Sequence, residues 1–214
     1  MQIDVFSDPI CPWCFIGKRR LERALAARPS IPSTINWRAF QLNPAMPAAG
    51  MDRGAYLTTK FGSATEADRL YRHIGQVGAL EGIEFRFDAI TVTPSTIDAH
   101  RLIRFAGLHD CQDTVAENLF SAYFLRGLDI GDRSILLEIG EDVGLETDLI
   151  DRYLSSTEDI EAVRNEDMHA RQIGIEGVPC FIVNGRYALS GAQEPEAFFS
   201  LFDMVQEEAR QAAL

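Results

Sequence analysis

Two cysteines separated by two residues, in the segment Cys-Pro-Trp-Cys at residues 11–14, constrain this chain more than any other feature. Before them, Ile3 and Val5 alternate with Asp4, as side chains of a half-buried strand do. After them, apolar side chains recur at three- and four-residue spacing, which is typical of a helix. The sequence therefore predicts a strand, then the cysteine motif, then a helix, with Cys11 at the helix N-terminus.

That position has a chemical consequence for Cys11. The free N–H groups and the dipole of a helix N-terminus favour an anion and lower the pKa of a cysteine placed there. Because the thiolate is the nucleophile of thiol–disulfide exchange, we expect Cys11 to attack and Cys14, one turn further on, to resolve the mixed disulfide. Pro12 suits the first helical turn, where its missing N–H would have no partner. The basic side chains at residues 18–20 are expected to reach water.

A paired-cysteine motif can also be half of a zinc site. Such a site needs about four ligands, and the remaining candidates are Cys111, Cys180 and the four histidines. No second Cys-x-x-Cys and no His-x-x-x-His accompanies the motif. We therefore expect thiol redox chemistry and no metal, with an inert pair of thiols as the remaining alternative.

The charge of the chain argues against several classes of partner. Its 214 residues carry a formal net charge of −12, whereas binding to nucleic acid or anionic lipid needs clustered lysine and arginine. No apolar run approaches the ~20 residues of a membrane span, and the N-terminus lacks the features of a secretory signal. We therefore expect no nucleic acid, no membrane and a cytoplasmic location. In that reducing compartment a Cys-x-x-Cys pair is more often catalytic than structural.

The order of the predicted elements indicates one fold interrupted by an insertion. Residues 1–45 read as strand–helix–strand, and residues 158–214 as helix–strand–strand–helix. Between them, residues 46–157 repeat a pattern of N-terminal cap, apolar stripe and closing glycine, which is typical of helices. Within that block, apolar side chains alternate along residues 83–92, which predicts an extended segment there. We thus predict an α/β protein, a thioredoxin-like redox domain with a large all-helical insertion domain. The strand–Cys-x-x-Cys–helix context agrees with that prediction.

A second chemical element lies at Val178-Pro179, directly before a predicted buried strand at residues 180–183. A proline is tolerated at the entrance of a strand because no ladder N–H is needed there. X–Pro bonds are usually trans, but a thioredoxin-like domain carries a cis-proline at this point, facing the cysteine pair. We therefore expect a cis Val178–Pro179 bond, with the backbone of Val178 able to pair with an extended substrate.

Three blocks of the sequence carry a family resemblance. The segments SDPICPWCFIGKRRLE, PSTIDAHRLIRFA and GVPCFIVNGRYALSGAQ resemble, in order and spacing, the DsbA-like thioredoxin-fold oxidoreductases, specifically their FrnE-type cytoplasmic branch. The resemblance covers nearly the whole chain, and its first and third blocks are the more specific. It implies a DsbA-like fold and a dithiol–disulfide activity on thiol or disulfide substrates, either proteins or small molecules.

The resemblance also implies roles for individual residues. It assigns Cys11 and Cys14 to the redox pair and Pro179 to the cis-proline. Substrate contacts are expected from the residues beside the pair and at the proline bond, namely Pro12, Trp13, Val178 and Pro179.

Two details of these blocks leave alternatives open. Cys180 stands where such proteins commonly have threonine, so a third sulfur could perturb the redox pair, although a free cysteine more often serves as a small apolar core residue. His100 and Arg101 could line a cleft between insertion and redox domain, but such a pair on an amphipathic helix more often faces solvent.

Three functions fit the sequence. The first is a thiol–disulfide oxidoreductase, whose direction (oxidase, reductase or isomerase) depends on how strongly the thiolate is stabilised. The second is a glutathione-dependent isomerase or transferase related to hydroxychromene-carboxylate isomerase; such proteins usually have a single serine where Cys11 stands, so the intact pair argues against it. The third is a chaperone-like binding module. We expect no tightly bound cofactor, glutathione as a candidate co-substrate, and a monomer or homodimer.

Overall fold

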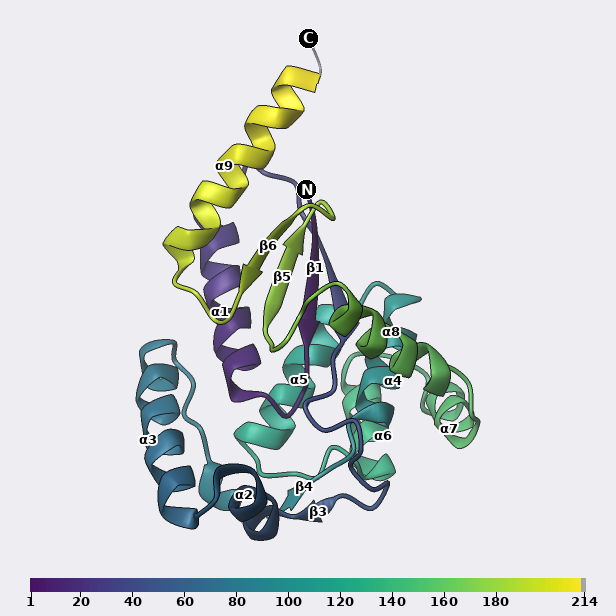
Figure 1. Ribbon diagram of the computed structural model, residues 1–214. Helices are drawn as coiled ribbons and strands as arrows, with labels where there is room; N and C mark the ends of the chain where they lie inside the picture. The colour runs from purple at the N-terminus through teal and green to yellow at the C-terminus, as the bar shows by residue number, and fades with distance from the viewer. Residues whose placement is uncertain (213–214) are drawn as a thin grey trace.

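The computed structural model describes residues 1–212 (Figure 1). At its centre lies a four-stranded mixed sheet with the strand order β2-β1-β5-β6. Strand β1 (Gln2–Ser7) pairs in parallel with β2 (Thr34–Ala39) and antiparallel with β5 (Cys180–Val183), which in turn pairs antiparallel with β6 (Tyr187–Ser190). Because Phe6 pairs with Cys180, the end of β1 that leads into the cysteine motif lies beside the start of β5 that follows Pro179.

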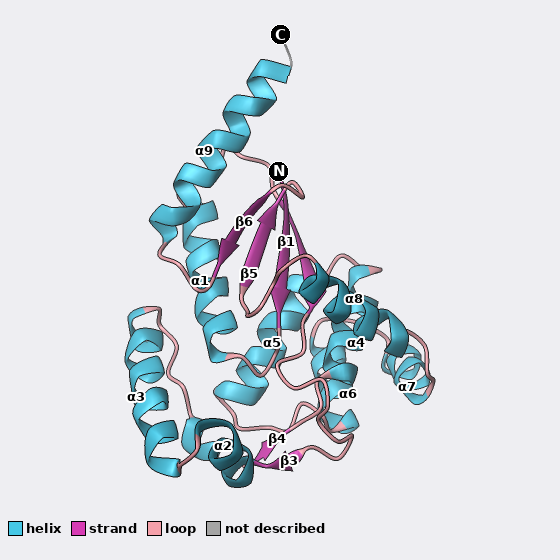
Figure 2. Ribbon diagram, in the orientation of Figure 1, coloured by secondary structure: helices cyan, strands magenta, loops and turns pink. Residues whose placement is uncertain are grey.

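The chain between β2 and β5 is mainly helical, as predicted, and Figure 2 shows helices on both sides of the sheet. Residues 83–92, predicted to be extended, form only a 3₁₀ turn and one short strand. None of the helices within residues 1–212 is long and apolar enough to cross a membrane. The remaining elements are α1 (Pro12–Ala26), β3 (Met51–Asp52), α2 (Arg53–Phe61), α3 (Ala64–Leu80), η1 (Phe87–Ala89), β4 (Val92–Thr93), α4 (Ile97–Gly107), α5 (Gln112–Phe124), α6 (Arg133–Asp142), α7 (Thr147–Ser155), α8 (Ile160–Gln172) and α9 (Pro195–Ala212).

The alternation of side chains along the strands gives the sheet two buried faces. On one face, Phe181 contacts Phe198 of α9, and Trp37 contacts Phe120 of α5. On the other face, side chains of β1, β5 and α8 form a separate apolar cluster with the segments beside them, made up of Phe6, Phe40, Ala170, Ile175 and Cys180. The central strands β1 and β5 therefore contribute to apolar clusters on both faces of the sheet.

The hydrophobic core continues from the sheet into the helical block. Phe15 of α1 stacks on Phe120 of α5, with ring centroids 5.1 Å apart and an interplanar angle of 8°. Both rings belong to one large apolar cluster that also contains Ile3 and Val5 of β1. The division of the chain into domains at residues 1–45, 46–157 and 158–214 stays a prediction.

Two basic side chains of α1 that were predicted to reach water are buried instead. The Lys18 side chain is only 3% exposed and pairs with Asp113 and Glu117 of α5, as well as with Glu22. Arg20 pairs with the buried carboxylate of Glu81 at 2.8 Å. The prediction is wrong here because acidic residues distant in sequence form ion pairs with these side chains and take the place of water.

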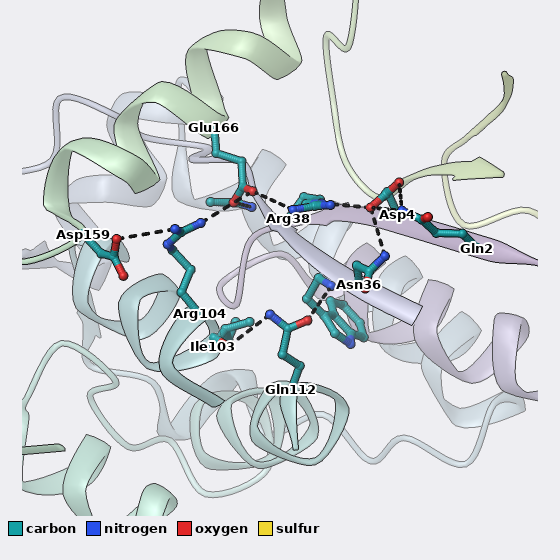
Figure 3. Close-up of polar contacts among 11 residues, drawn as sticks. Gln2, Asp4, Asn36, Arg38, Ile103, Arg104, Gln112, Asp159 and Glu166 are labelled. Atoms are coloured by element: carbon teal, nitrogen blue, oxygen red, sulfur yellow. Dashed lines mark hydrogen bonds and ion pairs between the residues drawn. The ribbon is translucent and has the colours of Figure 1, made fainter. Parts of the chain in front are cut away.

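Side chains from the helices satisfy the outer edge of strand β2 (Figure 3). The main-chain N–H of Trp37 donates to Gln112 Oε1 at 3.2 Å, and that of Ala39 donates to Glu166 Oε2 at 2.8 Å (Figure 3). Arg38 bridges Asp4 of β1 and Glu166 of α8. An unpaired strand edge can recruit another chain, so these contacts close that edge and fix β2 against α5 and α8.

Candidate active site

The cysteine motif lies at the start of α1, as predicted. Cys11 is the N-cap residue with an extended backbone (φ −93°, ψ 111°), and Pro12 is the first helical residue. The carbonyl of Cys11 accepts the N–H of Cys14 at 3.0 Å and that of Phe15 at 3.4 Å. Cys11 therefore lies at the N-terminus of α1, where the helix dipole favours an anion.

The two sulfur atoms of the motif lie side by side and are buried. All four cysteines, which lie within residues 1–212, are unpaired. Burial raises the pKa of Cys14 well above its ordinary value, and the neighbouring Cys11 raises it further. At neutral pH Cys14 is therefore a thiol, and it needs to lose a proton before it can act as a nucleophile.

The Val178–Pro179 bond is cis, which confirms the prediction made from the element order. The Cys11 thiol donates to the carbonyl of Val178, with 3.6 Å between sulfur and oxygen. Pro179 packs on α1 at Gly17, where an added Cβ would lie 2.7 Å from Pro179 Cγ. The absence of a side chain at Gly17 thus allows the loop that contains Pro179 to approach α1.

Replacing Gly17 by alanine is expected to push the proline loop away from α1. The added methyl group would overlap the Pro179 ring, and such overpacking costs about 1–3 kcal/mol of stability. We expect a lower midpoint in urea unfolding and a slower reaction of Cys11 with a disulfide reagent. Gly75→Ala in α3 is the matched control, since a Cβ there meets no described atom within 4 Å; equal stability of the two variants would contradict the prediction.

Trp13 is half-buried and contacts the helical block. Its ring centroid lies 6.2 Å from that of His73 on α3. His73 also lines a hollow of ≈ 430 Å³ together with Phe61, Glu66, Arg69 and Leu70. A larger hollow of ≈ 600 Å³ lies between α8 and the β5–β6 hairpin, and no residue of the cysteine motif lines it.

Cys180 is buried on the face of the sheet opposite to α1. It belongs to the apolar cluster with Phe6 and Ile175, and its Sγ lies 3.9 Å from Ser190 Oγ. The next residue, Phe181, points to the other face, where it approaches Gly17 of α1. Burial raises the pKa of Cys180. The structure therefore places this third sulfur in the core rather than beside Cys11 and Cys14.

Three polar residues are buried, at positions 8, 100 and 101, which the sequence did not predict. His100 and Arg101 are 3% and 1% exposed, so the expectation that they face solvent is wrong. Asp8, which is fully buried, was not singled out at all, although it stands inside the block SDPICPWC. The main-chain carbonyl of Asp8 accepts the N–H of Cys11 at 2.9 Å, so this residue helps to hold the motif in place.

Metal ligation was a competing interpretation of the cysteines. Within the described residues, no group of three or more histidine, cysteine, aspartate or glutamate side chains is arranged to hold a metal ion. The groups that contact the Cys11 sulfur are instead the main-chain carbonyl of Val178 and the thiol of Cys14.

The structure combines a mixed sheet, two cysteines at the start of α1 and a cis-proline directly before β5, beside Cys11. These features define a thioredoxin-fold protein. Residues 2–203 match the model of the DSBA-like thioredoxin domain. The chain therefore belongs to the DSBA-like thioredoxin family, as its sequence blocks indicated.

Solved structures with the same fold cover almost the whole chain. A probable DsbA oxidoreductase from Streptomyces coelicolor is 29% identical over 97% of this chain and 91% of that chain, with a TM-score of 0.89. A 2-hydroxychromene-2-carboxylate isomerase is 17% identical over 100% and 98% of the two chains, with a TM-score of 0.71. The cytosolic disulfide reductase DsbM from Pseudomonas aeruginosa, solved with GSH, is 18% identical over 97% and 100%, with a TM-score of 0.66. The last two likenesses concern the fold alone.

Proposed function

We propose that this protein is a cytoplasmic thiol–disulfide oxidoreductase of the FrnE type, with Cys11 as attacking thiol and Cys14 as resolving thiol. One observation carries the proposal: the Cys11 sulfur lies at the N-terminus of α1 and 3.6 Å from the carbonyl of Val178, next to the cis-proline. The helix N-terminus favours the thiolate that attacks a disulfide. The buried, protonated Cys14 suits a group that reacts only in the second step.

The reaction then runs in two exchanges. In the first, the Cys11 thiolate attacks one sulfur of the substrate disulfide, the substrate S–S bond breaks, and a mixed disulfide forms while one substrate thiolate leaves. In the second, Cys14 loses its proton and attacks Cys11 Sγ. The mixed disulfide breaks, the Cys11–Cys14 disulfide forms, and two electrons have passed to the substrate. Run backwards, the same steps oxidise a dithiol.

The substrate is a disulfide or dithiol in an extended segment or a small molecule. Its backbone would lie along Val178, and its flanking groups would lie near Trp13 and the hollow beside His73. Pro12 is buried in the first turn of α1, between Cys11 and Trp13. No tightly bound cofactor is needed for either exchange.

Equilibration with buffers of reduced and oxidised glutathione tests the proposal. In a Cys111→Ser/Cys180→Ala background, only the motif can be alkylated, because the other two thiols are absent. We expect alkylation of both motif cysteines to fall together, in one two-electron transition, as the buffer becomes more oxidising. A protein that keeps two free thiols at every buffer ratio, or gains only a glutathione adduct, contradicts the proposed cycle.

The similarity in fold to a 2-hydroxychromene-2-carboxylate isomerase favours a second candidate, a glutathione-dependent isomerase or transferase. DsbM, whose structure was solved with GSH, makes glutathione a candidate co-substrate for either function. A dithiol cycle requires Cys14, whereas glutathione-dependent isomerisation does not. Glutathione-dependent turnover of a hydroxychromene carboxylate by Cys14→Ser would therefore favour the second candidate.

A further inference from the structure

Most of the positively charged side chains of this acidic protein are paired with carboxylates. Its 20 lysine and arginine residues all lie in the described part of the chain, and all but four of them lie within 4.0 Å of an aspartate or glutamate oxygen. Three of the four exceptions, Arg53, Lys60 and Arg72, belong to α2 and α3, which pack against each other at one end of the molecule (Figure 1). The fourth, Arg152, lies on α7. Positive charge without an acidic partner is thus concentrated on α2 and α3.

Arg53 is the one buried member of this group. It is the first residue of α2 and is 7% exposed, whereas the other three are exposed. Its guanidinium group donates to the hydroxyl groups of Thr93 at 3.2 Å and Tyr123 at 3.5 Å. Its Cζ also lies 5.6 Å and 5.0 Å from the ring centroids of Tyr56 and Tyr71. A buried charge is costly unless an opposite charge neutralises it.

The groups that surround Arg53 do not supply that opposite charge. Burial raises the pKa of Tyr123 and of Tyr71, although Arg53 acts on both in the opposite direction. Both phenols are therefore neutral near pH 7. The face of an aromatic ring attracts a cation, but the ring carries no net charge. The positive charge of Arg53 is thus left without a counter-ion among its neighbours.

Arg53 lines a hollow of ≈ 440 Å³ between α2, α3 and the turn η1. The walls of this hollow combine apolar side chains with a second arginine that has no acidic partner: Leu57, Tyr71, Arg72 and Phe87. At Gly75, which also lines the hollow, an added Cβ would meet no described atom within 4 Å. The hollow therefore offers room for a small molecule that has an apolar part and an anionic group.

Two carboxylates line the same hollow, those of Asp68 and Asp88. Asp88 is paired with Arg86 at 3.3 Å, and both aspartates are exposed. Water and salt screen exposed charges much more strongly than buried ones. The buried cation of Arg53 therefore outweighs these two carboxylates at the inner end of the hollow.

We propose that this hollow binds a small molecule that carries a carboxylate, which pairs with Arg53 while its apolar part packs against Leu57 and Phe87. The planar fork of an arginine matches a carboxylate with two parallel hydrogen bonds. Such a ligand supplies the negative charge that the described residues around Arg53 lack. No residue of the cysteine motif lines the hollow, so the proposed site goes beyond the oxidoreductase function and does not depend on it.

The carboxylate has two conceivable sources, a separate small molecule or one end of a disulfide substrate. Tyr71 lies between the hollow and the cysteine motif: besides its burial, the nearby Cys11 raises the pKa of Tyr71, and Arg53 lies over the same ring. Trp13, beside Cys11, approaches α3 at His73. The two sites are therefore neighbours, and a disulfide with a carboxylate group could occupy both.

Binding of benzoate, followed by titration calorimetry, tests the site, with benzamide as the uncharged counterpart. We expect benzoate to bind with a Kd on the order of millimolar or tighter, and benzamide to bind about tenfold more weakly or less. Arg53→Met should weaken benzoate binding about tenfold or more, because it removes charge-assisted hydrogen bonds. Arg152→Met is the matched control, since it removes an exposed arginine of α7 and should leave binding unchanged. Equal affinity for the two probes, or wild-type affinity in Arg53→Met, overturns the inference.

Urea unfolding distinguishes a binding role of Arg53 from a structural one. Removing a buried charge that has no counter-ion should leave the unfolding midpoint of Arg53→Met unchanged or raise it. The increase in the midpoint that benzoate gives the wild-type protein should be lost in this variant. A lower midpoint together with unchanged benzoate binding would assign Arg53 a structural role and overturn the inference. If Arg53→Met does not fold, Gly75→Leu decides: it fills the hollow from α3 and keeps Arg53, so wild-type affinity for benzoate would contradict the site.

Two aromatic disulfide reagents identify the source of the carboxylate. Dithiobis(nitrobenzoate) carries a carboxylate on each ring and releases one thionitrobenzoate when Cys11 reacts, whereas dithiodipyridine carries no carboxylate. Both reactions are followed by stopped flow in the Cys111→Ser/Cys180→Ala background. A carboxylate that belongs to the substrate makes Arg53→Met about tenfold slower with the first reagent only, and benzoate then competes with that reagent alone. A separate ligand leaves both rates unchanged in Arg53→Met, although benzoate binding is lost. A protein that binds benzoate through Arg53 but reacts with neither reagent contradicts the proposed function instead.

Discussion

Replacing Cys11 by serine is expected to abolish disulfide exchange, by on the order of a thousandfold or more. A serine hydroxyl is not ionised near neutral pH, so it gains little from the N-terminus of α1 and does not attack a disulfide. The measurement is reduction of a protein disulfide such as that of insulin, together with the first release from an aromatic disulfide reagent. A Cys11→Ser protein with wild-type rates in both assays would exclude this sulfur as the nucleophile.

Cys14→Ser separates the two steps of the same cycle. The attacking Cys11 is retained, so the first exchange proceeds and the mixed disulfide accumulates because nothing resolves it. Mass spectrometry of the trapped adduct is the readout. Cys180→Ala is the matched control, since its sulfur lies on the opposite face of the sheet, and it should leave both steps intact.

Replacing Arg101 by methionine is expected to cost about 4 kcal/mol of stability. The guanidinium group is 1% exposed and donates to main-chain carbonyls at the end of α7 and in the turn before α8, as well as to Asp98. The last carbonyls of a helix have no partner within it, so the substitution leaves buried acceptors unpaired. The carbonyls belong to Tyr153, Leu154, Ser156 and Glu158.

Two further variants define what Arg101 contributes. Arg101→Lys keeps the charge but not the planar fork of donors, so most of the loss should remain. Arg72→Met removes an exposed arginine whose contact is with the Asp68 carbonyl, and should change stability by less than about 0.5 kcal/mol. Urea unfolding measures all three. An Arg101→Met protein as stable as Arg72→Met would show that the carbonyl groups of this turn have other hydrogen-bond partners.

The parts of the fold that could be predicted depend on local periodicity. The alternation around Ile3 and Val5 and the helical spacing after Cys14 indicate their elements without knowledge of the rest of the chain. The cis bond at Pro179 could be predicted because the order of elements already indicated the fold. At residues 83–92 the alternating aromatics looked extended, but most of them pack against helices and only Val92 and Thr93 pair with another strand.

The buried polar residues could not be predicted because their partners are distant in sequence. Asp8 is held by Leu42, and Arg101 by a turn more than 50 residues away. A helical wheel of α4 shows that His100 and Arg101 adjoin its apolar stripe, but not that a second layer of structure covers that side. For Asp8, the sequence offered one indication: the residue lies in the first of the three family-like blocks, shortly before Cys11. A resemblance to that block does not by itself assign a role to Asp8.

The pairing of Phe6 with Cys180 limits how the chain can change around its proline loop. Successive side chains of a strand alternate between faces, so a single residue inserted between Pro179 and Cys180 that shifts β5 by one position would move Cys180 to the place of Phe181 and Phe181 to that of Ile182. The Cys180 thiol would then point at α1, and the Phe181 ring would be forced onto the opposite face of the sheet. Insertions of two residues at this junction would therefore keep each side chain on its face. Insertion of one residue would bring the Cys180 thiol, a competing nucleophile, toward Cys11 and Cys14.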